Sequence, residues 1–340
     1  MNQIVLGLSD GVDSCVAAAL LKLAGFSVLG VYLETAGESE KQAARQSARE
    51  AGIAFESVDI HGELEAHVCR PFVDEYLRGR TPSPCPGCNR DVKLKILSDI
   101  ADRAGAEKIA TGHYVRSDGE RLYMGKSECD QSYMLARLVP SQVKRLLLPL
   151  GEYSKTEVRS MAREMGFSCA ARPDSRENCF IRGMDYAAYI EQKRPGALPG
   201  CGDVLFRGQR VGEHAGIYHF TVGQRWHTDF DGRRAYVQRI DAENNRVHLC
   251  LWEELFTSFV RLEALSFIAG RAPDGEFDAS IRVRHTRWET PACRVRLTDG
   301  GCEVSTLEPL RAPAPGQTAA LYQGDMLLGG GVVSGSGLDG

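Results

Sequence analysis

Two cysteines three positions apart stand in the segment TPSPCPGCNRDVK, residues 81–93. This pair, Cys85 and Cys88, has the spacing to bind a metal, to cycle as a disulfide or to attack a substrate, although such a pair can also be chemically idle. The eleven cysteines of the chain are odd in number and scattered. That usage is typical of a reducing compartment, where most cysteines are buried apolar side chains and a few are working thiols.

A second segment with chemical potential is GLSDGVDS, residues 7–14, which follows the first apolar run. Its small residues let backbone N–H groups approach phosphate oxygens, and the start of a helix adds a favourable dipole. The pattern is neither G-x-x-x-x-G-K-[ST] nor G-x-G-x-x-G, so ordinary kinases and dehydrogenases are not indicated. It resembles the S-G-G-x-D-S pyrophosphate loop of enzymes that cleave ATP between its α and β phosphates.

One residue departs from that loop pattern. Asp10 stands where glycine is usual, which places a carboxylate beside the phosphates. We expect this carboxylate to point to solvent, to bind Mg²⁺ or to alter the phosphate site.

Apolar runs and helical segments alternate through the first half of the chain. Strand-like runs such as IVLGLS, SVLGVYL and AFESVDI are separated by segments with helical spacing such as DSCVAAALLKLAG. This alternation predicts a parallel, doubly wound α/β sheet whose ligands lie at the carboxyl ends of the strands. The loops at residues 9–14, 81–88 and 111–114 should therefore share one face. His113, in the last loop, is either a functional group or a satisfied loop histidine.

After about residue 195 the pattern changes to short alternating runs with glycine or Asn-Asn at the reversals. This predicts a β-rich half, in which a small module is followed by a barrel or sandwich. The tail SGSGLDG, residues 334–340, is expected to be disordered.

Charge is unevenly distributed. The formal net charge is −4, yet five arginines stand between residues 282 and 296, and a second basic group surrounds the cysteine pair. Two such patches are compatible with an extended polyanion footprint. No apolar run approaches the roughly 20 residues that span a bilayer, and MNQIVLGLSDG does not resemble a signal peptide. A cytoplasmic protein with no membrane partner is expected.

Segments along the whole chain resemble one family. They are GLSDGVDS, RTPSPCPGCNRDVK, ATGHYVR, DQSYML, PLGEYSKTEVRSMAREMGF, DSRENCFIRG, HAGIYHFTVGQR, PGQTAALY and LLGGGVV. Their order is similar to that in the tRNA-specific 2-thiouridylases (MnmA/TrmU), which thiolate carbon 2 of the wobble uridine in certain tRNAs. The resemblance implies an ATP-pyrophosphatase-like domain of the adenine nucleotide alpha hydrolase type at residues 1–193, a small central tRNA-binding domain at 194–255 and a C-terminal β-barrel at 256–340.

The resemblance also implies binding sites. ATP, with Mg²⁺, would be bound by the loop residues and by two residues that border the adenosine, namely Gly7, Leu8, Ser9, Asp10, Gly11, Val12, Asp13 and Ser14, with Leu33 and Gly112. The anticodon stem-loop of tRNA would meet Ser83, Pro84 and Cys85 at the target base, and Cys129, Asp130, Gln131, Arg284 and His285 elsewhere. The sulfur donor would be a relay protein, a cysteine desulfurase or free sulfide.

The reaction that the resemblance implies needs two thiols. Adenylation turns the carbonyl oxygen of uridine into a leaving group, and sulfur then arrives as a nucleophile from a persulfide on one cysteine. A second cysteine releases that sulfur by attacking the persulfide and forming a disulfide. The family pattern places the persulfide on Cys179, in NCFI, and the second thiol at Cys88. Cys169, in FSCAA, is the nearby competitor of Cys179 and is interpreted as a core residue.

Cys85 stands where the family usually has an aspartate. A thiol cannot simply replace that carboxylate in acid–base chemistry, since the reference pKa values are about 8.5 and about 3.9. Together with Cys88 and Cys179 it gives three soft thiolates, which favour iron–sulfur or zinc. This set resembles that of the cluster-bearing tRNA thiolation enzymes, which implies a [4Fe–4S] cluster held by these three residues. The alternatives are persulfide and disulfide chemistry with Cys85 as an extra thiol, or zinc or no role at all.

Two other functions stay open. Asp10 and the missing aspartate would suit a tRNA-binding homologue that has lost catalysis. A related ATP-pyrophosphatase that acts on a small molecule, such as an amidating ligase, is the third reading, although the β-rich, arginine-bearing C-terminal half argues against it.

Overall fold

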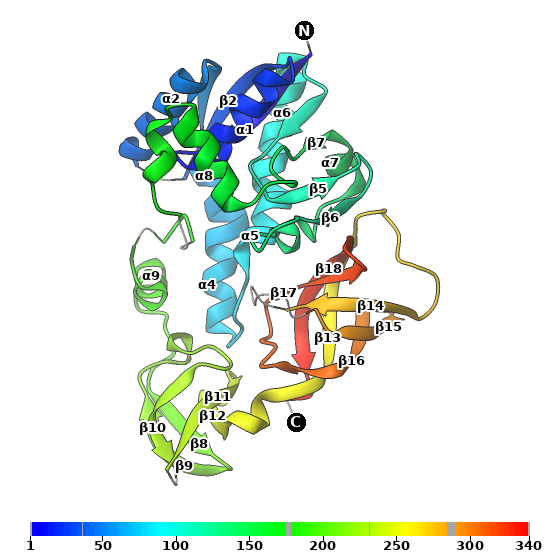
Figure 1. Ribbon diagram of the computed structural model, residues 1–340. Coiled ribbons are helices and arrows are strands. Elements are labelled where there is room, and N and C mark those ends of the chain that lie inside the picture. Colours follow the sequence, from blue (N-terminus) through cyan, green and yellow to red (C-terminus); the bar gives the residue numbers. More distant parts are fainter. Residues whose placement is uncertain are drawn as a thin grey trace.

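The computed structural model describes residues 2–35, 37–174, 178–181, 183–230, 232–283 and 290–338. The chain forms a parallel sheet near its N-terminus, then a small mixed sheet, and finally a closed barrel (Figure 1). The α/β class, the small central domain and the C-terminal barrel expected from the sequence are confirmed. Among the described residues, no helix is both long enough and apolar enough to cross a membrane.

The N-terminal sheet has five parallel strands in the order β3-β2-β1-β4-β7. They are β1 (Gln3–Leu8), β2 (Ser27–Glu34), β3 (Ala54–Asp59), β4 (Lys108–Ala110) and β7 (Leu146–Leu147). Side chains alternate along β1, so that Ile4 and Leu6 join one core while Val5 joins the core on the opposite face. Because both faces are buried, the strand reads as an unbroken apolar run.

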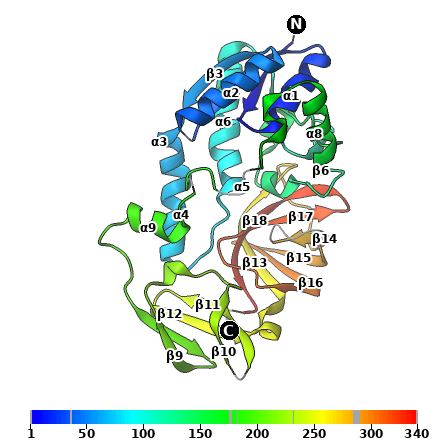
Figure 2. The same cartoon turned by 60° about the vertical axis from the view of Figure 1, so that its left-hand side comes forward.

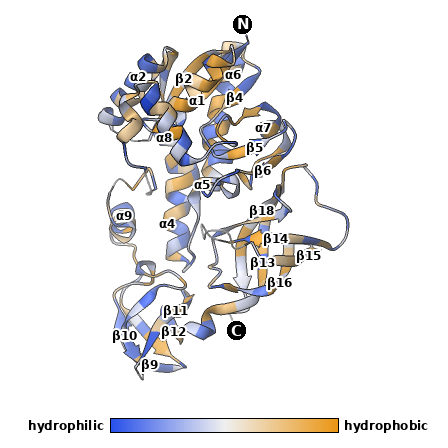
Figure 3. Cartoon of the chain, in the orientation of Figure 1, coloured by the Kyte–Doolittle hydropathy of each residue, from blue (hydrophilic) through white to orange (hydrophobic). Residues whose placement is uncertain are grey.

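Helices cover both faces of this sheet (Figure 2). One face carries α1 (Val12–Leu23), α2 (Glu38–Ala51) and α8 (Lys155–Glu164), and the other carries α6 (Leu94–Ala104) and α7 (Pro140–Arg145). The residues of α1 are mostly apolar because this helix is buried, whereas α2 is largely hydrophilic (Figure 3). The different compositions follow from how much of each helix meets water.

Two helical columns lead away from the sheet, and each contains a π-helical turn. The first joins α3 (His61–Leu64), η1 (Glu65–Cys69) and α4 (Arg70–Leu77), and the second joins α5 (Pro84–Cys88), η2 (Asn89–Lys93) and α6. In η1 and η2 the backbone bonds span five residues, from Arg70 N to Glu65 O and from Leu94 N to Asn89 O. Such wider turns change which side chains share a helix face and are frequent at functional sites. The two columns pack together where η1 meets α5.

The central sheet follows α9 (Tyr186–Lys193) and has the order β10-β11-β12-β8-β9. Its strands are β8 (Gly202–Phe206), β9 (Gln209–His214), β10 (Arg225–Phe230), β11 (Arg233–Asp241) and β12 (Arg246–Leu251). Val204, Val237 and Val247 form its buried core with Trp226. This small domain therefore has a core of its own.

Six antiparallel strands close into the C-terminal barrel, because β13 pairs with both β16 and β18. They are β13 (Phe256–Phe267), β14 (Phe277–Arg282), β15 (Ala292–Thr298), β16 (Gly301–Arg311), β17 (Thr318–Gln323) and β18 (Met326–Ser336). A hairpin from the first domain, β5 (Val115–Ser117) and β6 (Leu122–Met124), adds to β18 and ties the two domains together. The short 3₁₀ turns are η3 (Ser132–Leu135), η4 (Ser168–Ala171), η5 (Ile217–His219) and η6 (Trp252–Leu255).

The disorder expected for residues 334–340 is wrong for the described part of that tail. Gly335 and Ser336 belong to β18 and pair with Arg261 and Val260 of β13. Leu338 is buried. The glycines there mark close packing, since a Cβ at Gly337 would collide with the Thr257 hydroxyl.

Candidate nucleotide and thiol site

The segment GLSDGVDS forms the turn between β1 and α1. Gly11 is the N-cap of α1, and its N–H donates to Ser9 Oγ at 3.1 Å. Ser14 Oγ accepts from the Ser9 N–H at 3.0 Å and lies 3.0 Å from Ser9 Oγ. These bonds hold the turn compact, while the first N–H groups of α1 have no partner inside the helix and are available to an anion. The turn therefore offers N–H donors at a helix start, the kind of group that binds anions.

Asp13 is held in a network of polar side chains beside this turn. Lys155 Nζ lies 2.7 Å from both carboxylate oxygens of Asp13, and the Tyr114 hydroxyl donates to Oδ1 at 2.6 Å. Lys155 also pairs with Asp174 at 2.7 Å, as Arg159 does at 2.9 Å. Burial alone would raise the pKa of Asp174, but the hydrogen bond and charge of Lys155, with the charge of Arg159, hold it below its ordinary value. The network places cations beside the first turn of α1.

The unexpected Asp10 is paired with a cation of the protein. Arg172 Nη1 donates to the Asp10 carboxylate at 2.9 Å and to the Asp10 carbonyl oxygen at 2.7 Å. Arg172 directly follows the η4 turn, as its C-cap. Arg172 therefore compensates the negative charge that Asp10 adds to the turn between β1 and α1. This ion pair is a departure from the usual loop.

The segment after β4 connects the nucleotide turn to the cysteine pair. A Cβ on Gly112 would come within 3.1 Å of the backbone of Asp13 and Ser14, so a larger residue would push the turn away. His113, the next residue, lies 3.5 Å from the Asn89 amide through Nε2 and 2.8 Å from Thr111 Oγ1 through Nδ1. The loops at residues 9–14, 81–88 and 111–114 thus meet at one edge of the sheet, as the topology predicted.

The His113 ring is kept neutral by its surroundings. Burial, and after it the positive charge of Lys93, lowers the pKa of His113 to about 4. Near neutral pH the ring therefore links Asn89 to Thr111 without carrying a charge. The sequence allowed a functional group or a satisfied loop histidine at this position. Both ring nitrogens of His113 lie at hydrogen-bond distance from a side chain of the protein.

The three cysteines of the expected sulfur site have different environments. Cys88 ends α5 and is buried, Cys85 in the same helix is half-buried, and Cys179 is exposed. Cys85 Sγ lies 4.0 Å from Oδ1 of Asn178, the residue before Cys179, so the segment NCFI lies beside α5. Burial raises the pKa of Cys88 to about 11, and the charges of Cys179 and Cys85 add to that rise. The three sulfurs therefore lie within electrostatic range of one another.

Lys93 lies within range of the charges of these thiols. It ends the π-helical turn η2, is half-buried, and forms no hydrogen bond or ion pair within the described part of the chain. Burial alone lowers the pKa of Lys93, but the negative charges of Cys88, Cys179 and Cys85 outweigh burial and raise it. Its own charge opposes the rise in the pKa of Cys85 and Cys88. Lys93 is therefore placed to compensate a negative charge on these thiols.

The three cysteine thiols are donors that suit a soft metal, but they are not arranged to bind one metal ion together. Across the described residues, from 2 to 338 with the gaps stated above, no three His, Cys, Asp or Glu side chains are grouped so that they could hold a metal ion. Cys85, Cys88 and Cys179 are neighbours here, not ligands around one point.

The segment expected to face the target base is anchored by the barrel. The Thr81 N–H donates to Pro315 O at 2.7 Å, and the Ser83 N–H donates to Gly316 O at 3.4 Å. Gly316 has a φ of +93°, and a Cβ there would meet the Thr81 backbone at 3.1 Å, so this turn requires glycine. The segment PGQTAALY thus positions Ser83 and Pro84 at the start of α5.

Asp130, expected at tRNA, is buried between the first domain and the barrel. Its carboxylate accepts hydrogen bonds from Arg282 Nη1 at 2.7 Å, from Ser132 Oγ at 2.9 Å and from the Gly125 N–H at 2.8 Å. Its neighbour Gln131 accepts from the Tyr114 N–H at 3.1 Å through Oε1. The bonding capacity of Asp130 is used inside the protein, so its contact with tRNA stays a prediction, as it does for the half-buried Cys129.

Many arginines of the two basic patches are paired with carboxylates. Arg284 and His285 lie outside the described residues. The pairs are Arg282 with Asp130, Arg294 with Glu276 and Asp278, Arg296 with Glu303, Arg80 with Glu75 and Glu263, and Arg90 with Asp91. The net positive charge that these patches offer to a polyanion is therefore smaller than the arginine count suggests.

Sequence reasoning missed three residues that the structure brings to the site. Lys155 and Arg172 come from a later part of the chain and reach the nucleotide turn only through packing of α8 and η4 on α1. Lys93 was noticed only as a member of a basic patch. Lys93 stands five residues after Cys88. That spacing puts two side chains on one face only in a π-helical turn, and such a turn cannot be recognised from the sequence.

Family models match consecutive parts of the chain. The model described as the tRNA methyl transferase HUP domain matches residues 2–183, the tRNA methyl transferase PRC-barrel domain matches 188–251, and the Aminomethyltransferase beta-barrel domain matches 257–333. The fold and the site thus define a protein with a HUP nucleotide domain followed by two β domains.

Named relatives are similar over nearly the whole chain. The tRNA-specific 2-thiouridylase MnmA of Acetivibrio thermocellus is 34% identical over 355 residues, covering 98% of this chain and 99% of the relative. The protein of the same name from Methylorubrum populi is 38% identical, with coverage of 98% and 93%. MnmA 2 of Caldanaerobacter subterraneus is 36% identical, with 98% of both chains covered. The chain belongs to the MnmA family of tRNA-specific 2-thiouridylases.

Proposed function

We propose that this protein transfers sulfur to carbon 2 of the wobble uridine of tRNA in an ATP-dependent reaction. The observation that carries the proposal is the bridge between two sites: Gly112 packs on the nucleotide turn, and the adjacent His113 contacts Asn89, next to Cys88. One short segment therefore connects the turn that we expect to bind phosphate with the helix that carries the cysteine pair. Membership of the MnmA family supplies the substrate class.

The first step activates the base. Oxygen O2 of uridine attacks the α-phosphorus of ATP, the bond from that phosphorus to the bridging oxygen breaks, and pyrophosphate leaves. Mg²⁺, when bound, would offset the charge of the pyrophosphate. The N–H groups at the start of α1 stabilise the phosphate charge, and Lys155 holds Asp13 in place beside them. Arg172 keeps Asp10 from repelling the phosphates. The adenylated oxygen can then leave carbon 2 as AMP.

The second step delivers sulfur. Cys179 is exposed, so a donor can load it as a persulfide. The Cys88 thiolate attacks Cys179 Sγ, a Cys88–Cys179 disulfide forms, and the terminal sulfur leaves as hydrosulfide, which displaces AMP from carbon 2. Lys93 compensates the negative charge on Cys88 and then on the released sulfur. A thiol reductant must reduce the disulfide before the next cycle.

The partners of this reaction are tRNA and a sulfur donor. A relay protein, a cysteine desulfurase or free sulfide can each reach an exposed Cys179. All eleven cysteines are free thiols, which suits a protein of the reducing cytoplasm.

A [4Fe–4S] cluster held by Cys85, Cys88 and Cys179 is a second candidate for the sulfur chemistry, favoured by the cysteine that replaces the usual aspartate. When bound, it would offer an iron that lacks a protein ligand and could take up an extra sulfide. The three thiols would have to come closer together than they are here. Iron and acid-labile sulfide in anaerobically purified protein decide the matter, because a colourless, iron-free protein that thiolates tRNA from a persulfide donor excludes the cluster.

Pyrophosphate release separates the enzyme from a tRNA-binding homologue that has lost catalysis. Protein incubated with ATP, Mg²⁺, polysulfide and tRNA is expected to release pyrophosphate, and omission of tRNA should abolish the release. Binding of tRNA without any pyrophosphate would favour the binding homologue instead. Release that needs no tRNA would point to a small-molecule substrate.

A further inference from the structure

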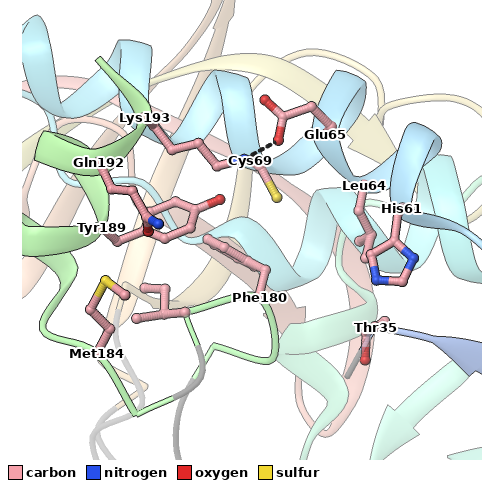
Figure 4. Close-up of a pocket in the computed structure, with 11 residues that line it drawn as sticks. Thr35, His61, Leu64, Glu65, Cys69, Phe180, Met184, Tyr189, Gln192 and Lys193 are labelled. Carbon is pink, nitrogen blue, oxygen red and sulfur yellow. Dashed lines mark hydrogen bonds and ion pairs between the residues drawn. The ribbon is translucent and has the colours of Figure 1, made fainter. Parts of the chain in front are cut away.

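Cys69 is a fourth thiol near the sulfur site, and the mechanism above does not use it. It is the last residue of η1 and is 6% exposed. Its side chain lines a cavity of about 750 Å³ that is also lined by Phe180, Met184 and Tyr189. Figure 4 shows the Cys69 sulfur pointing towards Phe180 and Tyr189.

Direct contacts connect Cys69 to the segment that carries Cys179. Tyr189 and Cys69 line the same cavity, and each affects the pKa of the other. Phe180, the residue after Cys179, packs its ring on Tyr189 with the centroids 5.5 Å apart, and on Phe72 of α4 with the centroids 5.2 Å apart. Phe180 therefore anchors the Cys179 segment beside the helical column in which Cys69 lies.

Cys69 also lies near Cys88. The turn η1 packs against α5, which ends at Cys88, and both thiols belong to one buried cluster. The charges of Cys69 and Cys179 both raise the pKa of Cys88, after the larger effect of burial. Cys69 therefore neighbours both partners of the disulfide that sulfur transfer would leave.

We propose that Cys69 is a relay thiol that takes over this disulfide. The inference rests on the proposed thiolation and its Cys88–Cys179 disulfide. The Cys69 thiolate attacks Cys88 Sγ, a Cys69–Cys88 bond forms, the Cys88–Cys179 bond breaks, and Cys179 leaves as a thiolate that takes up the proton lost by Cys69. The number of disulfides does not change, so the exchange needs no oxidant. The disulfide moves to two buried residues, and the exposed Cys179 is free to accept sulfur before an external thiol reductant acts.

Disulfide mapping after one turnover tests the relay. Wild-type protein is loaded with inorganic polysulfide, desalted, mixed with ATP, Mg²⁺ and tRNA without reductant, quenched in acid and alkylated. Mass spectrometry should find a Cys69–Cys88 disulfide and an alkylated Cys179, and a second addition of polysulfide should reload Cys179. Cys69→Ser should form the same 2-thiouridine in its first turnover, but keep the Cys88–Cys179 disulfide and reload Cys179 roughly tenfold less. Cys201→Ser removes an exposed cysteine and should behave as wild type.

Failure of the relay and failure of the proposed function give different results. If 2-thiouridine forms while Cys69 of the wild type remains fully alkylated as a free thiol, the relay is wrong and the thiolation stands. If the wild type forms no 2-thiouridine, both are wrong. Because the wild-type map needs no variant, the test remains decisive even where Cys69→Ser does not fold.

Discussion

At the scale of single residues, one lysine feels the charges of all three cysteines of the site. Lys93 is half-buried, and no carboxylate pairs with it within the described residues. A charge removed from water without a partner is costly, unless an opposite charge forms beside it. The negative sulfur species of the proposed reaction would be that opposite charge. Lys93 is therefore expected to matter for the reaction more than for the fold.

Replacement of Lys93 tests this role. Lys93→Met should lower the rate of 2-thiouridine formation roughly 100-fold, because the charge that stabilises the developing sulfide is lost. Stability against urea should be unchanged or higher, because a desolvated charge has been removed. Lys93→Arg, the matched control, should keep part of the activity. A Lys93→Met protein with wild-type rates would show that Lys93 does not act on sulfur.

His113 should make the fold sensitive to acid. Its pKa is about 4 in the folded protein against an ordinary value of 6.5, so folding favours the neutral ring. The stability that this provides is complete above pH 6.5 and is lost as the pH falls towards 4. Urea unfolding of the wild type should show that decline, and His113→Gln, which has no titrating ring, should show a smaller one. Equal declines in the two proteins would assign the acid sensitivity to other groups.

At the scale of elements, the nucleotide turn depends on a later turn of the chain. Arg172, which directly follows the η4 turn, donates to both the carboxylate and the carbonyl oxygen of Asp10. The family's usual glycine needs no such partner. The Asp10–Arg172 pair should therefore act as a unit.

A double-mutant cycle tests this unit. Arg172→Gln should weaken ATP binding roughly tenfold, because an uncompensated carboxylate then faces the phosphates. Asp10→Gly in the same chain should restore most of the affinity, and Asp10→Gly alone should bind ATP at least as well as the wild type. The dissociation constant of ATP, measured by calorimetry, gives all four values. Additive effects of the two changes would show that Asp10 and Arg172 act independently.

The sequence predicts the helices and strands better than it predicts contacts between residues far apart in the chain. The alternation of apolar runs and helical segments predicted the parallel sheet, and the topology of such sheets predicted that three loops meet. Cys85, Cys88 and the Cys179 segment could be brought together by the family resemblance, and the contact between Cys85 and Asn178 agrees with it. The Asp10–Arg172 pair joins residues 162 positions apart, so no local pattern could reveal it. The π-helical turns that place Lys93 and Cys69 depend on tertiary packing as well.

At the scale of the whole molecule, a buried ion pair joins the first domain to the barrel. Arg282 of β14 and Asp130 are 8% and 6% exposed, and the Arg282 guanidinium lies 4.5 Å from the centroid of the Tyr133 ring. The arginine count had suggested a polyanion-binding surface that included Arg282. The structure instead gives this residue a structural contact, because the closed barrel brings β14 against the loop that contains Asp130.

Loss of Arg282 should destabilise the assembly of domains. Arg282→Met leaves the Asp130 carboxylate buried without its cation, and the free energy of unfolding should fall by about 3 kcal/mol. Arg294→Met, on the exposed side of the same barrel, should leave the unfolding midpoint nearly unchanged because surface pairs contribute little. Urea unfolding followed by circular dichroism compares the two. An equal effect of both changes would contradict the structural role of the buried pair.

The central claim is that the nucleotide turn and the thiols act together on tRNA. Its most direct test is mass spectrometry of the wobble nucleoside after tRNA has been incubated with ATP, Mg²⁺ and a persulfide donor. The wild type should convert uridine to 2-thiouridine, and Cys179→Ala should make none while still releasing pyrophosphate in the presence of tRNA. Unmodified uridine in the wild-type reaction, or wild-type yields of 2-thiouridine from Cys179→Ala, would contradict the account.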